Sequence, residues 1–132
     1  MRDAEPAVRR RCMPQDGKPF TLYVQIYSEQ HRDDVDKDLD SIRGLGIAVA
    51  NIENVVLTAH REGHKAPPQG VRPRLVYGMD GARCAIALQS ALAGKERFKG
   101  VSLQALPANL TSSSTSIELW IPRPAATNNK KS

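Results

Sequence analysis

The chain has 132 residues, of which 40% are hydrophobic and 5% aromatic, and its 19 Lys and Arg residues exceed its 14 Asp and Glu residues. This composition is typical of a small globular domain, and a chain of this length can bury a core without metals or disulfides. No stretch approaches the roughly 20 apolar residues that span a bilayer, and no apolar run follows Arg9, Arg10 and Arg11 as in a signal peptide. We expect a soluble chain without membrane insertion, cytoplasmic as written, or periplasmic if it is cut from a longer envelope protein.

Both ends of the chain have the composition of flexible segments. Residues 1–18 combine several arginines with Pro6, Pro14 and Gly17 and lack apolar periodicity, which predicts a flexible basic arm. Residues 123–132 contain Pro, Asn and Lys and predict a flexible tail in the same way. The folded α/β module is therefore expected over residues 19–122.

The first predicted unit is a strand followed by a helix. Apolar and polar residues alternate from Phe20 to Ser28, which predicts a half-buried strand. Ser28 is a favourable N-cap for a helix that runs to about Gly44. The buried stripe of this helix is expected at Val35, Leu39 and Ile42. The aspartates between Asp33 and Asp40 lack the spacing of a calcium loop and are interpreted as a solvated helix face.

The next segment has weaker signals. Short apolar runs at residues 47–49 and 55–58 offer a second strand of unknown register, and the Gly and Pro residues within 60–70 predict a loop. His60 and His64 have the spacing of a metal-binding pair on a helix. Because Arg61 occupies the position where a zinc protease motif requires Glu, we expect two surface histidines and no metal site.

The second half repeats the order of the first. Residues 74–78 predict a strand, and a helix is expected from Asp80 to Gly94. Alternation predicts two final strands at residues 101–105 and 117–121, separated by a polar spacer at 109–115. Positions fifty apart match between the halves: Tyr27 with Tyr77, Val35 with Ala85, Ile42 with Leu92 and Gly44 with Gly94. The sequence predicts an α+β fold of order βαββαβ(β), a two-layer sandwich with two helices on one face of a single mixed or antiparallel sheet.

The uncovered face of this sheet is the predicted ligand or partner surface. Strand parity places Tyr23, Gln25, Tyr27, Gln104, Glu118 and Trp120 there. Arg74 and Tyr77 are also candidates, although adjacent Leu75 and Val76 leave the parity of their strand ambiguous. Amphipathic rings on an exposed sheet can stack on sugars or bases or bury a partner's surface. The alternative is that an arm, a loop or a second copy of the chain covers them.

Other motifs give no support for catalysis. Cys12 and Cys84 lie far apart and are interpreted as free thiols. The serines from Ser112 to Ser114 lack the Gly-x-Ser-x-Gly turn of a nucleophile elbow, and no phosphate-binding glycine pattern occurs. We predict no catalytic residue, no metal and no cofactor.

The basic balance, with a net charge of +5, raises the possibility of nucleic-acid binding. The clusters of Lys and Arg lie mostly on the two predicted flexible ends. The predicted strands also lack the glycine and aromatic signature of RNA-binding sheets. Nucleic-acid binding through the sheet face and basic arms therefore stays an alternative.

One family resemblance covers residues 20–106. The chain resembles the sporulation-related repeat (SPOR) domain in its first strand, its Leu45 and Gly46 turn, the strand at residues 74–78 and the second, Ala-rich helix. The second half also looks like the C-terminal domain of LytR-type cell-wall enzymes. The SPOR resemblance implies binding of peptidoglycan glycan strands by the sheet face, with contacts at Tyr23, Gln25, Tyr27 and Tyr77. The long loop at residues 60–70 and the additional strand around Trp120 depart from the family pattern.

Taken together, these patterns predict a noncatalytic bacterial binding module. A protein partner is the favoured ligand, as for a domain of a larger signalling or envelope assembly. Peptidoglycan glycan strands and nucleic acid are the alternatives.

Overall fold

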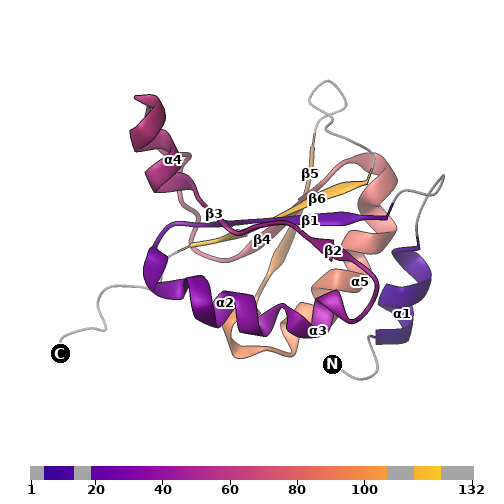
Figure 1. Ribbon diagram of the computed structural model, residues 1–132. Helices are drawn as coiled ribbons and strands as arrows, with labels where there is room; N and C mark the ends of the chain where they lie inside the picture. The colour runs from indigo at the N-terminus through magenta and orange to yellow at the C-terminus, as the bar shows by residue number, and fades with distance from the viewer. Residues whose placement is uncertain (1–4, 14–18, 107–114, 123–132) are drawn as a thin grey trace.

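The computed structural model describes residues 5–13, 19–106 and 115–122, and its architecture is α+β with one mixed sheet (Figure 1). The described strands are β1 (Thr21–Ile26), β2 (Ala48–Val49), β3 (Glu53–Asn54), β4 (Arg74–Tyr77), β5 (Ser102–Ala105) and β6 (Ser116–Ile121). The described helices are α1 (Glu5–Arg11), α2 (Arg32–Asp38), α3 (Asp40–Arg43), α4 (Val55–Glu62) and α5 (Ala82–Ala93). Three short 3-10 helices are η2 (Glu29–His31), η3 (Met79–Gly81) and η4 (Glu96–Phe98). In this part of the chain, no helix combines the length and the apolar character that a membrane crossing requires.

The sheet contains two βαβ units joined by the last described strand. The strand order is β2-β1-β6-β4-β5, and β3 also pairs with β1. β1 is parallel to β2, and β4 is parallel to β5, so each strand and its following helix lead into a parallel partner. β6 lies between the units, parallel to β1 and antiparallel to β4. The predicted fold class and duplicated βαβ arrangement are confirmed, and the sheet is the mixed one of the two predicted kinds.

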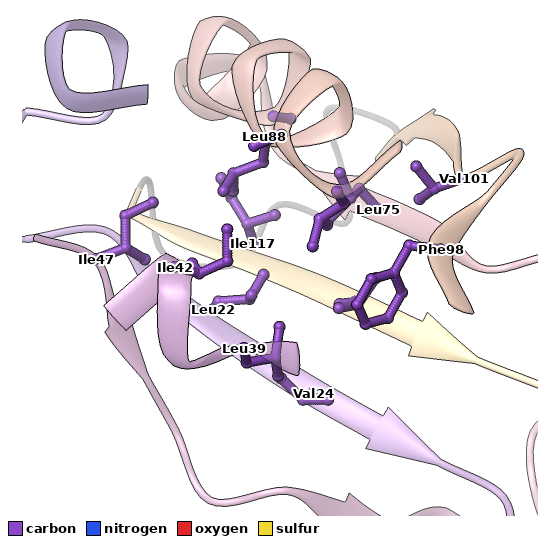
Figure 2. Packing of buried hydrophobic residues seen from close by; sticks show 14 of the residues in the cluster. Leu22, Val24, Leu39, Ile42, Ile47, Leu75, Leu88, Phe98, Val101 and Ile117 are labelled. Atoms are coloured by element: carbon purple, nitrogen blue, oxygen red, sulfur yellow. The ribbon is translucent and has the colours of Figure 1, made fainter. Parts of the chain in front are cut away.

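The core fills the space between the sheet and the layer formed by α2, α3 and α5. Figure 2 shows side chains of β1, β4 and β6 pointing toward this helical layer. The predicted helix stripes supply the other half of the core, since Val35, Leu39, Ile42, Ala85, Leu88 and Leu92 are all fully buried. Two of the matched pairs, Val35 with Ala85 and Ile42 with Leu92, are thus buried in both halves, whereas Tyr27 and Tyr77 lie on opposite sides of the sheet.

The first predicted helix is present but is divided into three segments. The Ser28 hydroxyl accepts a hydrogen bond from the Gln30 backbone N–H at 3.3 Å, as expected for an N-cap. The segment then forms η2, α2 and α3, with a break at Leu39. Leu39 is nevertheless fully buried, so the break leaves the apolar stripe directed at the sheet.

Residues 55–62 differ from the prediction. The expected strand at 55–58 and the expected loop at His60 are wrong, because these residues form α4, which projects away from the helical layer (Figure 1). The Asn54 side chain accepts hydrogen bonds from the N–H groups of Val56 and Leu57 at 3.0 and 3.2 Å. Gly63 ends the helix at a φ of 76°, where a residue without a Cβ is favoured. A good N-cap and C-cap therefore outweigh the β-propensity of the Val-Val-Leu-Thr run.

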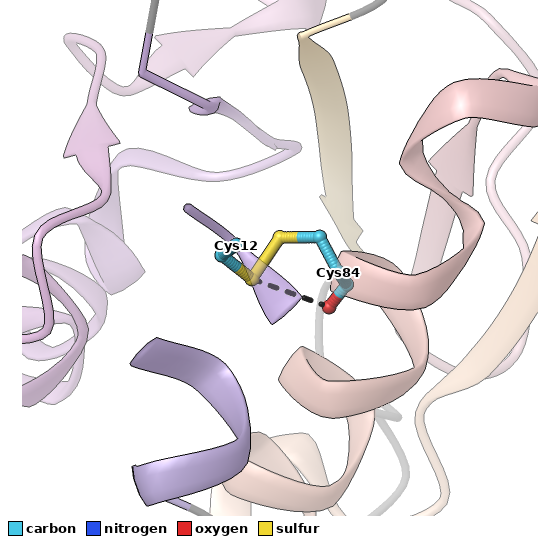
Figure 3. Close-up of a disulfide and its surroundings, with 2 residues drawn as sticks. All are labelled: Cys12 and Cys84. Atoms are coloured by element: carbon cyan, nitrogen blue, oxygen red, sulfur yellow. Dashed lines mark hydrogen bonds between the residues drawn. A yellow bond between two sulfur atoms is a disulfide. The ribbon is translucent and has the colours of Figure 1, made fainter. Parts of the chain in front are cut away.

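The N-terminal segment also differs from the prediction. α1 packs on α5, Val8 is fully buried, and Cys12 forms a disulfide with Cys84 of α5 (Figure 3). The predicted flexible arm is thus wrong for residues 5–13, and the predicted free thiols are wrong. Residues 1–4 and 14–18 of that arm, the tail at 123–132 and the serines from Ser112 to Ser114 lie outside the described residues.

Candidate functional site

The candidate site is the face of the sheet opposite α2, α3 and α5, which we call the open face. Strand register fixes its members as Thr21, Tyr23, Gln25, Arg74, Val76, Ser102, Gln104, Ser116, Glu118 and Trp120. Gln25, Trp120 and Arg74 form one row across β1, β6 and β4. Tyr23 begins the next row, which continues through β6 and β4 to Gln104. The predicted surface is therefore largely assembled on one side of the sheet.

Trp120 is held in place by three neighbours. The Arg74 guanidinium carbon lies 5.2 Å from the ring centroid, within the range of a cation–π contact. The indole N–H donates to Glu118 Oε1 at 2.8 Å, and the Tyr27 ring lies 6.3 Å away with a tilt of 45°. The ring remains half-buried. Its orientation is consequently fixed before any ligand arrives.

Tyr27 is not available for a ligand, in contrast to the prediction. Its hydroxyl donates to the backbone carbonyls of Pro67 and Pro68 at 3.1 and 3.0 Å, and only 5% of the residue is exposed. Burial raises the pKa of this hydroxyl, and the nearby Arg74 charge opposes part of the rise. The loop after α4 therefore covers this end of the face. The predicted alternative, in which a loop covers the rings, holds for Tyr27.

Tyr23 is the most accessible aromatic ring of the open face, with 41% of the residue exposed. It faces Glu118 in register across β1 and β6, and Gln104 is exposed at the far end of the same row. Tyr23 and Gln104 therefore present a ring and an amide to the solvent.

Two polar atoms of the open face are buried without a partner among the described residues. They are Gln25 Oε1, an acceptor, and Arg74 Nε, a donor, and Gln25 as a residue is only 9% exposed. Their residues flank Trp120 on the two neighbouring strands. Buried polar atoms are normally satisfied, so each of these two atoms would gain from a ligand that brings the complementary group as its side chain turns toward the open face.

Tyr77, whose strand parity the sequence left open, does not belong to the open face. It pairs in register with buried Ile117 and packs at the margin of the core. The other ambiguous residue of β4, Arg74, does join the face, and Val76 with it. Strand parity had already placed Glu118, the anchor of the indole, on this face, but the prediction missed Val76. Only the antiparallel register of β4 with β6 could have identified Val76, since Leu75 and Val76 are equally apolar.

The two candidate histidines are not brought into a common site. His60 is exposed on α4, whereas the His64 ring contacts Glu62 Oε1 at 2.9 Å and the Lys65 carbonyl at 3.1 Å. These two contacts raise the pKa of His64, the one to the carbonyl contributing more. Within the described residues, no group of three His, Cys, Asp or Glu side chains has the arrangement of a metal site.

A polar hollow of about 540 Å³ lies elsewhere, between α2 and the segment that joins β2 to β3. Its arginines are already engaged. Arg32 binds both Glu29 oxygens at 2.8 Å and the Ile52 carbonyl at 2.6 Å, and Arg43 binds Asp36 and Asp40. These ion pairs stabilise the arrangement of α2 and α3. We therefore assign no ligand to the hollow.

The described basic residues of the predicted arm do not lie on the open face. Arg9, Arg10 and Arg11 lie in α1, which packs on α5 of the helical layer (Figure 1). On the described part of the open face, the charged side chains are Arg74 and the acidic Glu118. Comparison with protein-family models, curated proteins and solved structures finds no match to this chain, so its function has to be inferred from this geometry.

Proposed function

We propose that this chain is a noncatalytic binding module that recognises a protein partner through its open face. The observation that carries the proposal is the pair of buried, unpartnered atoms, Gln25 Oε1 and Arg74 Nε, beside Trp120. An unsatisfied buried polar atom costs about 1–3 kcal/mol. A polypeptide surface carries both N–H donors and carbonyl acceptors, and it can satisfy both atoms when the Gln25 and Arg74 side chains turn toward it.

The aromatic residues support the same proposal. Trp, Tyr and Arg are the residue types that most often dominate binding energy at protein interfaces. Here Trp120 and Arg74 are stacked, and Tyr23 stands exposed one row away. Because Glu118 and Tyr27 already fix the indole, little side-chain entropy is lost when a partner covers it.

The Cys12–Cys84 disulfide supports an oxidising compartment over a reducing one for this module. A periplasmic or otherwise extracytoplasmic location is therefore favoured in the proposal. Cell fractionation with thiol labelling tests it. Two protected cysteines in freshly lysed, thiol-blocked cells are expected, and two freely alkylated cysteines would contradict it.

Site-specific photo-cross-linking in the producing cells tests the protein partner. A benzophenone side chain at Tyr23 is expected to form one discrete protein adduct, which is lost when Trp120→Ala is added. The matched control carries the same cross-linker at Ile86, which is 44% exposed but lies on α5 in the helical layer. Equal adducts from both positions, or no adduct from Tyr23, would contradict the proposal.

Peptidoglycan glycan is the second candidate ligand. It is favoured by the combination of an exposed ring at Tyr23 with polar groups at Gln25 and Glu118, because sugars stack on rings and hydrogen-bond to their neighbours. Of the contacts implied by the SPOR resemblance, Tyr27 is buried and Tyr77 lies on the core side of the sheet. Titration with peptide-stripped glycan strands, followed by Trp120 fluorescence, distinguishes the ligands. A saturable, salt-insensitive change that Tyr23→Ala abolishes would favour glycan, and a flat titration would favour the protein partner.

A further inference from the structure

β5 forms one edge of the sheet. It pairs with β4 on one side, and no described strand pairs with it on the other. An edge strand leaves a row of backbone donors and acceptors that can bind another strand.

The hydrogen-bond pattern identifies these groups. The N–H of Ser102 donates to the Pro73 carbonyl at 3.1 Å, and the N–H of Leu106 donates to the Tyr77 carbonyl at 2.8 Å. In a parallel ladder every second residue faces the neighbouring strand. The intervening residues, Leu103 and Ala105, therefore direct their backbone N–H and C=O groups outward.

The two edges of the sheet are not equally protected. The opposite edge consists of β2 and β3, which have two residues each and are interrupted between Val49 and Glu53. β5 is a continuous strand of four residues without Lys, Pro or a bulge, the usual devices against unwanted pairing. Of the two edges formed by the described strands, the β5 edge is therefore the one suited to pair with an added strand.

We propose that an extended, acidic segment of the partner protein adds to β5 as a new edge strand. This rests on the proposed function and specifies the partner's chemistry. Ser102 and Gln104 belong to the open face, so a strand added at β5 continues the rows of Arg74 and Val76. The partner would then occupy the edge and the face together.

The charge at the start of β5 gives the reason for an acidic segment. Arg72 lies beside Gly100, where an added Cβ would be 3.7 Å from its Cδ atom. Lys99 is exposed at the same corner. The acidic side chain there, Glu96, lies 3.7 Å from Lys99 Nζ, so the charge of Arg72 remains in excess at this corner. Carboxylates on an added strand would meet this basic corner.

The first test uses the full chain and a capped eight-residue peptide of alternating Glu and Val, with a Lys and Val peptide as its control. Backbone amide signals and hydrogen exchange are followed by NMR. We expect the amides of Leu103 and Ala105 to exchange rapidly in the free chain and to become at least about tenfold protected by the acidic peptide. Equal protection by both peptides, or by neither, would overturn the proposal.

A matched pair of variants tests the backbone contact. Ala105→Pro removes one outward N–H without breaking a bond to β4, whereas Ala105→Val keeps it. The acidic peptide should bind Ala105→Pro about tenfold more weakly than wild type, and Ala105→Val within about twofold. Equal affinity for the two variants would overturn strand addition. If Ala105→Pro fails to fold, the exchange measurement on the wild-type chain decides the matter.

Other outcomes assign the edge to a different occupant. Protection of Leu103 and Ala105 that rises with chain concentration in the absence of peptide would show a second copy there. Protection in the dilute free chain would show that another segment of the chain itself covers the edge. Either result overturns the inference. The proposed function fails separately, by the absence of a Tyr23 cross-link, so the two failures can be distinguished.

Discussion

Arg74 and Trp120 face each other across β4 and β6, with the guanidinium 5.2 Å from the centre of the indole. The contact joins the second βαβ unit to the central strand on the side of the sheet that lacks the helical layer. A partly exposed cation–π contact is worth about 0.5–1 kcal/mol. It therefore contributes to stability while it also orients the ring.

Arg74→Ala should lower the free energy of unfolding by about 0.5–1 kcal/mol and increase quenching of Trp120 fluorescence by acrylamide. Arg72→Ala is the matched control, since Arg72 is exposed and has no aromatic contact in the described residues. It should change neither quantity. Quenching that is the same in both variants would show that Arg74 does not shield the ring.

Tyr27→Phe should loosen the loop that covers the end of the open face. The hydroxyl bonds to the Pro67 and Pro68 carbonyls are lost, at a cost of about 1 kcal/mol. Limited trypsin cleavage after Lys65 should become faster. Tyr23→Phe removes an exposed hydroxyl with no described partner and should leave the cleavage rate unchanged. Slow cleavage in both variants would mean that the loop is held by other contacts.

Reduction of the Cys12–Cys84 disulfide should lower stability by roughly 4 kcal/mol, because the crosslink joins residues 72 apart in the sequence. α1 has seven residues and cannot persist as an isolated helix, so its packing on α5 should weaken too. Urea unfolding with and without reductant measures the difference. The Cys12→Ala, Cys84→Ala double variant should be as unstable as the reduced chain and insensitive to reductant. Equal stability of the oxidised and reduced wild-type chain would contradict the prediction.

Leu88→Ala should destabilise the chain by about 2–5 kcal/mol, because it opens a cavity where α5 meets the sheet (Figure 2). Ile86→Ala, two residues away on the exposed side of α5, should cost less than about 1 kcal/mol. Thermal unfolding of the two variants checks the comparison. A similar loss of stability in the two variants would show that the buried side of α5 has been misassigned.

Glu29 should make stability depend on pH below about 4.5. Its hydrogen bonds from Arg32, and then from Asn54, lower its pKa from 4.5 to about 2. A group with a lowered pKa stabilises the fold fully above its unfolded value, and this contribution disappears as the pH falls through the folded value. Glu29→Gln should therefore be less stable than wild type near pH 6, with the difference shrinking toward about pH 2. Arg32→Met, which removes the stronger partner, should weaken the dependence of stability on pH over the same interval. A stability difference between Glu29→Gln and wild type that does not change with pH would contradict the assignment.

The parts of the fold that depend on local periodicity could be predicted from the sequence. The alternation in β1 placed Leu22 and Val24 in the core, and the spacing of Val35, Leu39 and Ile42 placed that stripe against the sheet. These patterns are intrinsic to one element. They need no knowledge of where its neighbours lie.

Features that depend on two distant segments could not be predicted in this way. The disulfide requires Cys12 to reach Cys84, and nothing near either residue encodes that meeting. The side of β4 that carries Arg74 rather than Tyr77 is set by its register with β6. The burial of Tyr27 depends on carbonyl groups of the loop at Pro67 and Pro68. The wrong prediction of a strand at residues 55–58 has a local cause. Asn54 could have been recognised as the N-cap of a helix, although the run that follows it favours a strand.

The position of β6 has a consequence for the order in which the chain can fold. Thr21 pairs with Ser116, and Arg74 pairs with Trp120, so the centre of the sheet comes from the last described strand. During synthesis both βαβ units leave the ribosome before the strand that joins them. Until β6 arrives, the inner edges of β1 and β4 lack the neighbour they have in the native sheet, and this interval is when the chain is most open to pairing with the wrong strand.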